Sequence, residues 1–131
     1  MTDLAGTLLG HHTRCEALRA AAAASLEAGD WSAFATRLEA LCAGLYAHFS
    51  FEEDELFPEF ERVSGQREAT APLRTEHRDI RAILDALGAA SAMYDPEGCR
   101  AEFATVSLLL RQHQANEEQI IYPALARILD G

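Results

Sequence analysis

Lysine is absent from this sequence, and basic residues of any kind are scarce. All 11 basic residues are arginines, against 21 aspartates and glutamates, so the formal net charge is −10. A surface of this sign repels a phosphate backbone, and the arginines form no basic stripe along the chain. These features exclude nucleic acid as an expected partner. Most of the acidity is typical of solvated helix surfaces, although it is also compatible with cation binding.

Long hydrophobic runs and closely spaced cysteines are missing too. No apolar stretch approaches the roughly 20 residues of a membrane helix, and the N-terminus lacks the basic start and apolar segment of a signal peptide. Cys15, Cys42 and Cys99 are widely spaced and form no Cys-x-x-Cys motif, which argues against a disulfide framework. We therefore expect a soluble, cytoplasmic protein that contacts no membrane. At 131 residues, it should form one domain, 1–131.

Four segments repeat apolar residues at steps of three and four, which is the period of an amphipathic helix. The first starts near residue 3; two others start after Asp30 and Asp95, which are suitable N-cap residues, and Thr70-Ala71-Pro72 opens the remaining one. The expected links are 28–30, 63–70 and 88–95. Links this short favour antiparallel neighbours, and no strand-like alternation occurs. The sequence predicts an all-α, up-down-up-down antiparallel four-helix bundle, with a kink or fraying near Pro58 and Pro123.

One motif occurs twice at a fixed offset of 65 residues. HFSFEEDELFP begins at His48 and HQANEEQIIYP begins at His113, and both read His-x-x-x-Glu-Glu-x-x-x-aromatic-Pro. The same offset aligns His12 with His77. Each half of the chain therefore offers one histidine, followed 36 residues later by a His-x-x-x-Glu pair.

These polar residues lie on the faces that should be apolar. Leu41 and Leu45 are followed on the same helical face by His48 and Glu52, and the second motif follows the same rhythm. A buried, unpaired carboxylate costs several kcal/mol or more unless it is neutralised, paired or bound to metal. The alternatives are hydrogen-bonded core histidines or helix-stabilising His-Glu pairs, but repetition on the inner seam favours metal. The six candidate ligands are His12, His48, Glu52, His77, His113 and Glu117. Imidazole with carboxylate suits iron, manganese or zinc.

Some neighbouring residues leave alternatives open. His11 fits the apolar rhythm of the first helix, whereas the 65-residue offset favours His12, which we choose. Glu16 follows His12 by four residues and is either a further ligand or, as we expect, an exposed carboxylate. Glu53 and Glu118 point about 100° away from the ligand face. We expect these two to support the ligands or to be solvated.

The chain resembles the hemerythrin-like, His-His-Glu cation-binding family. The matching stretches cover almost the whole chain: HH at 11–12, HFSFEEDELFP at 48–58, EHRDIRAIL at 76–84 and HQANEEQIIYP at 113–123. The resemblance implies a four-helix bundle that holds a non-haem di-iron centre, two iron ions with an oxo or hydroxo bridge. Manganese and zinc are the alternative metals. Carried over by position, the terminal ligands would be His12, His48, His77 and His113, and the bridging ligands would be Glu52 and Glu117.

The sequence departs from the oxygen carriers of that family at two places. Leu73 stands four residues before His77, where the carriers have another histidine, and the last helix has His-x-x-x-Glu in place of their His-x-x-x-x-Asp. The missing imidazole argues against reversible oxygen transport and leaves coordination positions open. We expect a protein that binds, senses or reacts with O2, peroxide or nitric oxide, with an unspecified redox partner. The alternatives are a non-catalytic iron-binding or regulatory module, or a structural zinc- or manganese-binding bundle.

Overall fold

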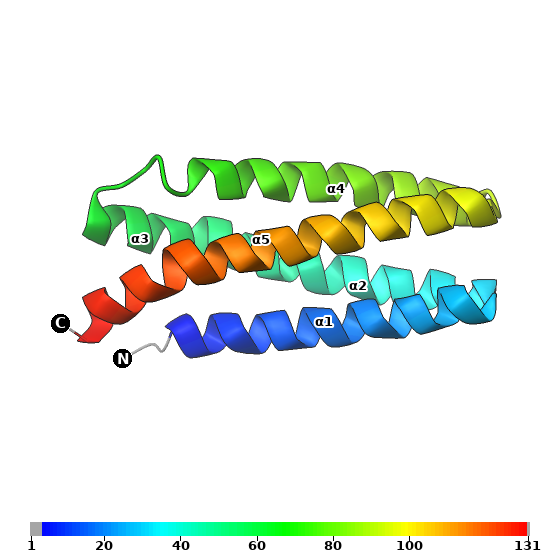
Figure 1. Ribbon diagram of the computed structural model, residues 1–131, viewed down its shortest axis with the longest axis horizontal. Helices are drawn as coiled ribbons and strands as arrows, with labels where there is room; N and C mark the ends of the chain where they lie inside the picture. The colour runs from blue at the N-terminus through cyan, green and yellow to red at the C-terminus, as the bar shows by residue number, and fades with distance from the viewer. Residues whose placement is uncertain (1–3, 131) are drawn as a thin grey trace.

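The computed structural model describes residues 4–130, and within them the side chains of residues 6–121, 123 and 124. Every element in this range is a helix, which confirms the all-α prediction. The elements are α1 (Leu4–Ala28), α2 (Trp31–Phe51), the π-helical turn η1 (Glu52–Leu56), α3 (Phe57–Ser64), α4 (Ala71–Ala92) and α5 (Pro96–Asp130). Because α2, η1 and α3 follow one another without a break, four rods lie side by side, with both chain ends at one end of the molecule (Figure 1). The predicted helix start at residue 3 lies outside the described residues.

Local side-chain hydrogen bonds explain where two of the helices begin. The Asp30 carboxylate accepts the backbone N–H of Ala33 at 3.1 Å at the start of α2. The Asp95 carboxylate accepts the backbone N–H of Gly98 at 3.0 Å before α5. Each bond satisfies a backbone donor that has no partner inside its helix, as the N-cap prediction requires.

The predicted link 88–95 is wrong in its first half, because α4 continues through Gly88 to Ala92. Residues 89–92 read Ala-Ala-Ser-Ala, and the high helix propensity of alanine outweighs the cost of about 1 kcal/mol for a glycine inside a helix. The helix ends only where the Met93 N–H bonds the Ala89 carbonyl and Tyr94 takes a positive φ of 53°. The connection to α5 is therefore only three residues long, 93–95.

The disturbance predicted near Pro58 takes the form of a π-helical turn. The N–H of Phe57 bonds the carbonyl of Glu52, five residues back instead of the four of an α-helix. Proline lacks an N–H, and its ring clashes with the carbonyl four residues earlier in a regular α-helix, so a widened turn accommodates it. By contrast, Pro123 lies inside α5, which continues past it. The two halves of the 65-residue repeat therefore differ in backbone geometry.

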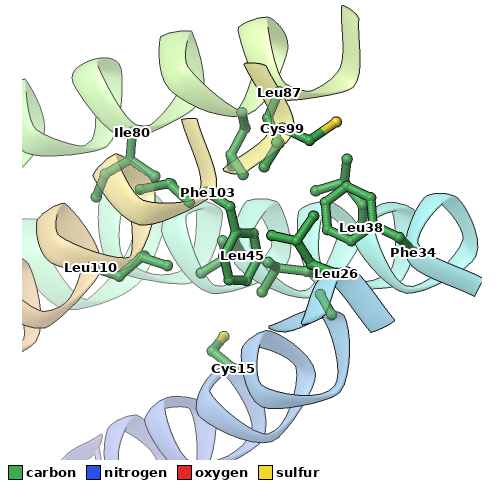
Figure 2. Close-up of a cluster of buried hydrophobic side chains, with 14 of the residues drawn as sticks. Cys15, Leu26, Phe34, Leu38, Leu45, Ile80, Leu87, Cys99, Phe103 and Leu110 are labelled. Carbon is green, nitrogen blue, oxygen red and sulfur yellow. The ribbon is translucent and has the colours of Figure 1, made fainter. Parts of the chain in front are cut away.

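Two hydrophobic clusters fill the bundle and leave a polar layer between them. The larger cluster includes Cys15, Leu45, Ile80 and Leu110, and Figure 2 shows its side chains converging from α1, α2, α4 and α5. The smaller cluster contains Leu8, Leu56, Phe57, Phe60, Leu73 and Ile121. On each rod, the candidate ligands lie in sequence between a residue of one cluster and a residue of the other. The ligands therefore occupy one level of the bundle with apolar packing on both sides.

The cysteines form no disulfide, as their spacing predicts. All three cysteines are free; Cys15 and Cys99 are buried and Cys42 is half-buried. None of the helices in the described range combines the length and the apolar composition that a membrane crossing requires.

Candidate metal centre

The six predicted ligands converge in the polar layer. They form two groups that overlap: His12, His48, Glu52 and Glu117 make one, and Glu52, His77, His113 and Glu117 make the other. Within each group, one ligand atom per residue lies within 4.8 Å of all the others. Every member is buried, with exposed fractions between 0% for both glutamates and 7% for His12. The shared members are the two carboxylates, which is the arrangement that a carboxylate-bridged pair of ions requires.

The His77–His113 group is the more closely packed of the two. The Nε2 atoms of His77 and His113 lie 3.1 Å apart. His77 Nε2 lies 2.8 Å from Glu52 Oε1, and His113 Nε2 lies 2.5 Å from Glu117 Oε1. All four side chains thus present nitrogen or oxygen atoms to one small volume.

The His12–His48 group is looser. His48 Nε2 lies 3.3 Å from Glu52 Oε1, and His12 Nε2 lies 3.8 Å from Glu117 Oε2. The two imidazole rings meet edge to face, with centroids 5.0 Å apart. The histidines of this group come from α1 and α2, whereas those of the other group come from α4 and α5.

Several buried polar atoms in the polar layer have no hydrogen bond, which is consistent with bound cations. Glu52 Oε2, Glu117 Oε2 and His48 Nε2 are buried and accept or donate no hydrogen bond among the described residues. A buried carboxylate oxygen without a partner is costly, and a cation removes that cost. The set of nitrogen and oxygen donors suits iron, manganese or zinc and does not suit soft metals, which prefer sulfur.

In the absence of a cation, Glu52 and His113 hold protons more tightly than usual, and Glu117 holds its proton less tightly. Burial raises the pKa of Glu52 well above its usual range, and the neighbouring Glu117 carboxylate reinforces this. Burial disfavours the charged form of His113, but its hydrogen bonds with Glu117 and Glu52 prevail and raise its pKa to about 10. Burial also opposes ionisation of Glu117, yet hydrogen bonds with Glu52 and His113 hold its pKa well below the usual range. At neutral pH the metal-free cluster therefore retains a proton on His113, and Glu52 keeps its proton to a higher pH than an exposed glutamate does.

The other two histidines for which the pKa shifts strongly are neutral. Burial lowers the pKa of His48 to about 3 and that of His77 to about 4. A neutral imidazole has one nitrogen lone pair free for a metal. Both residues are thus in the protonation state that ligation needs.

Residues around the cluster contact the Nδ1 atoms of three of its histidines. His113 Nδ1 donates to Glu76 at 2.6 Å, and His77 Nδ1 donates to Glu53 at 3.1 Å. His48 Nδ1 lies 3.2 Å from the Nδ1 of His11. With Nδ1 engaged in this way, Nε2 is the atom that faces the cluster, as in many histidine-ligated metal sites.

These contacts decide the alternatives that the sequence left open. His11 lies outside both ligand groups and contacts His48, whereas His12 belongs to one of the groups. Glu53 supports His77, and Glu118 is exposed. Glu16 is exposed and pairs with Arg19 at 2.7 Å. Glu53 and His11 are therefore outer partners, and Glu16 and Glu118 are surface residues.

Sequence reasoning missed Glu76, Arg81 and Asn116 as members of the site. Asn116 donates to Glu76 at 2.8 Å, and Arg81 donates to both oxygens of Glu53 at 3.2 Å. The 65-residue offset could have identified Glu76, because it pairs that residue with His11. No comparable pattern in the sequence identifies Arg81 or Asn116.

One surface pocket reaches the centre. It has a volume of about 360 Å³, lies against α1 and α2, and has His11, Arg14, Cys15 and His48 among its lining residues. A larger pocket has a volume of about 650 Å³. Its lining residues lie within 31–42, in α2, and within 88–94, at the end of α4 and the link after it, and none of the six candidate ligands is among them. The smaller pocket is the one relevant to a ligand that approaches the metal centre.

The chain matches a known family over most of its length. Residues 3–125 match the family model described as the hemerythrin HHE cation binding domain. Uncharacterised proteins of Mycobacterium bovis and Mycobacterium tuberculosis are each 28% identical to it over an alignment of 90 residues. The alignment covers 64% of this chain. The match spans only 35% of the length of these curated relatives. No solved structure matches the chain.

Proposed function

Because this chain belongs to the hemerythrin HHE cation-binding family, we propose that it is a non-haem di-iron protein that binds, senses or reacts with O2, peroxide or nitric oxide. The observation that carries the proposal is the pair of buried four-residue groups that share Glu52 and Glu117. Two ions held in these groups would be bridged by both carboxylates. Its partner is then a small diatomic molecule or peroxide, and neither nucleic acid nor a membrane.

Each residue of the cluster has a defined task in this proposal. His12 and His48 would hold one ion, and His77 and His113 the other. The bound iron pair supplies electrons and open coordination positions for a small oxidant. The hydrophobic clusters on both sides exclude water from the layer, and the outer residues fix the tautomer and orientation of the imidazoles.

Leu73 supports a protein that reacts with its ligand over one that carries it reversibly. The side chain is only 1% exposed and packs in the smaller hydrophobic cluster with Leu8, its partner under the 65-residue offset. Neither position supplies a further imidazole. We propose that both ions have few protein ligands.

We also propose that the helices run up-down-up-down, which the short links support. Free cysteines favour the cytoplasm as its location.

The decisive experiment is metal analysis of protein prepared without oxygen, followed by its visible spectrum when O2 is added. We expect two iron ions per chain and a new absorption band after oxidation. The matched variant Glu118→Gln, which changes an exposed glutamate next to Glu117, should behave like the wild type. One zinc ion per chain, or no iron after anaerobic loading, would reject the proposal.

A structural zinc or manganese site, or a non-catalytic iron module, is the second candidate. The observation in its favour is that each group offers four protein ligands, the number that fills the tetrahedral sphere of structural zinc. This candidate predicts a protein whose folding depends on metal, but whose spectrum does not change with O2, peroxide or nitric oxide.

A further inference from the structure

We propose that the two ion sites are unequal, with the His77–His113 site filling first and more tightly because carboxylates accept the Nδ1 hydrogen bonds of its histidines. The inference rests on the proposed two-ion function, and it assigns Glu53 and Glu76 as positioning residues that act through the histidines. The His12–His48 site then holds the weaker, more exchangeable ion.

The first support is the surroundings of His77. Its Nδ1–H donates to Glu53 Oε1 at 3.1 Å, and Arg81 holds both oxygens of that carboxylate at 3.2 Å. The His77 ring is also stacked on Phe49, with centroids 4.0 Å apart, and on Phe57, with centroids 5.6 Å apart. The ring therefore has little freedom to rotate away from the cluster.

The second support is an equivalent arrangement at His113. Its Nδ1–H donates to Glu76 Oε1 at 2.6 Å, and the Asn116 amide donates to the other oxygen of Glu76 at 2.8 Å. Both histidines of this group are thus bonded to an anchored carboxylate. An anion that accepts the Nδ1–H bond orients the ring and makes Nε2 a stronger donor to a metal.

The other site lacks this feature at His48. The 65-residue offset aligns His48 with His113 and His11 with Glu76, and the structure repeats the same contact in both halves. However, His48 Nδ1 meets the Nδ1 of His11 at 3.2 Å, so its partner is an imidazole instead of a carboxylate. A neutral acceptor orients the ring but does not add negative charge to strengthen the bond.

The surface pocket adds a difference in access. Both His48 and its partner His11 line the pocket of about 360 Å³ against α1 and α2, whereas among the described residues at the other site only Glu76, the partner of His113, lines a pocket, of about 40 Å³, and neither His77 nor His113 lines it. Water and chelators can thus approach the His12–His48 site more directly. Exchange of the ion at this site should be the faster one.

The test is an anaerobic titration of the metal-free 131-residue chain with iron(II). Binding is monitored by calorimetry in the presence of a competing chelator. The wild type should bind two ions in two resolved steps. Glu76→Gln keeps a hydrogen-bond acceptor beside His113 but removes its charge, so the dissociation constant of the first step should rise by about 10- to 100-fold. Glu53→Gln should act on the same step, and His11→Gln should weaken only the second step.

Matched variants separate this effect from general damage. Glu118→Gln removes one charge at the repeat-equivalent of Glu53, where the side chain is exposed, and it should change neither step. His12→Ala should retain the tight step and lose the weak one. The metal-free melting temperatures of the glutamine variants should match that of the wild type, because a purely structural role would change these temperatures and both steps together.

Two results would overturn the inference alone: two ions that bind with equal affinity, or Glu76→Gln and His11→Gln weakening the same step. If His12→Ala fails to fold, the glutamine variants still decide between these outcomes. A chain that binds fewer than two ions under all conditions would instead refute the proposed function, and this inference with it.

Discussion

Raising the pH from 6.5 to 8.0 should destabilise the metal-free protein but not the iron-loaded protein. In the metal-free state His113 has a pKa of about 10 against an ordinary 6.5, so the folded protein keeps a proton that the unfolded chain releases. This contribution to stability is complete below pH 6.5 and is lost as the pH rises toward 10. Glu52, whose pKa is raised well above 4.5, has the same sign. Its contribution is likewise lost with rising pH.

The other shifted groups of the cluster do not change this sign in the chosen window. His48 and His77, whose pKa values are lowered to about 3 and about 4, are neutral in the folded protein, but in the unfolded chain they release their remaining protons just above the ordinary 6.5, so they offset part of the loss near pH 6.5. Glu117, whose pKa is lowered, is ionised in both states there. The cysteine thiols, whose ordinary pKa is 9.0, titrate mainly above the window. The protons on His113 and Glu52 therefore set the sign toward pH 8.0, where the unfolded histidines have released theirs.

The expected size follows from proton linkage. Each retained proton lowers the free energy of unfolding by about 1.4 kcal/mol per pH unit. The proton on His113 gives at most about 1.4 kcal/mol per pH unit, which is on the order of 5 °C in melting temperature for a chain of this length, and Glu52 adds to the loss with the same sign. In the loaded protein the cations replace both protons, so this loss should disappear.

The assay is urea unfolding followed by circular dichroism at pH 6.5, 7.25 and 8.0, without oxygen, on chelator-treated and iron-loaded protein. Glu52→Gln cannot titrate at this position and should make the loss of stability with rising pH less steep in the metal-free protein. The exposed Glu118→Gln should keep the wild-type slope. Metal-free protein that is equally stable, or more stable, at pH 8.0 than at pH 6.5 would refute the assignment of the two protons.

Three further predictions concern single substitutions. Glu52→Ala removes a carboxylate common to both groups, so metal analysis should find fewer than two ions per chain; two retained ions would show that Glu52 is not a bridge. Leu73→His adds an imidazole one turn before His77 on the same helical face, and it should make the spectral change with O2 at least partly reversible under vacuum. The wild-type spectrum should not recover, and full recovery would identify an oxygen carrier. Gly88→Ala should raise the free energy of unfolding by up to about 1 kcal/mol, because an added Cβ meets no atom within 4 Å; thermal unfolding that shows a loss of stability would contradict the helical placement of Gly88.

Much of the fold could be predicted because helices impose a fixed period. The steps of three and four placed the apolar residues and five of the candidate ligands on inner faces, the 65-residue offset selected His12, and the structure buries all six. Asp30 and Asp95 marked helix starts because their carboxylates bond backbone N–H groups only three residues away. Interactions of this kind are local, so the sequence contains all the information that they need.

The errors and omissions arose where a residue's role depends on a distant neighbour or on a balance of small terms. The end of α4 was placed too early because one glycine was weighed more heavily than the alanines after it. A disturbance was predicted near Pro58, but its form, a π-helical turn that begins at Glu52, could not be read from the sequence. The repeat suggested two equivalent halves, whereas this turn is present in only one of them.

By itself, the sequence determined the helical class, the inner faces, the family and the six residues that could share two ions, since each follows from spacing along a regular helix or from a motif. Only the tertiary structure decided which neighbours hold the ligands: Glu76 and Asn116 at His113, Glu53 and Arg81 at His77. It also placed His11 against His48. The physical reason is that these contacts join helices more than 20 residues apart in the chain, so they depend on how the helices rotate and pack against one another, and the period of a single helix does not encode this.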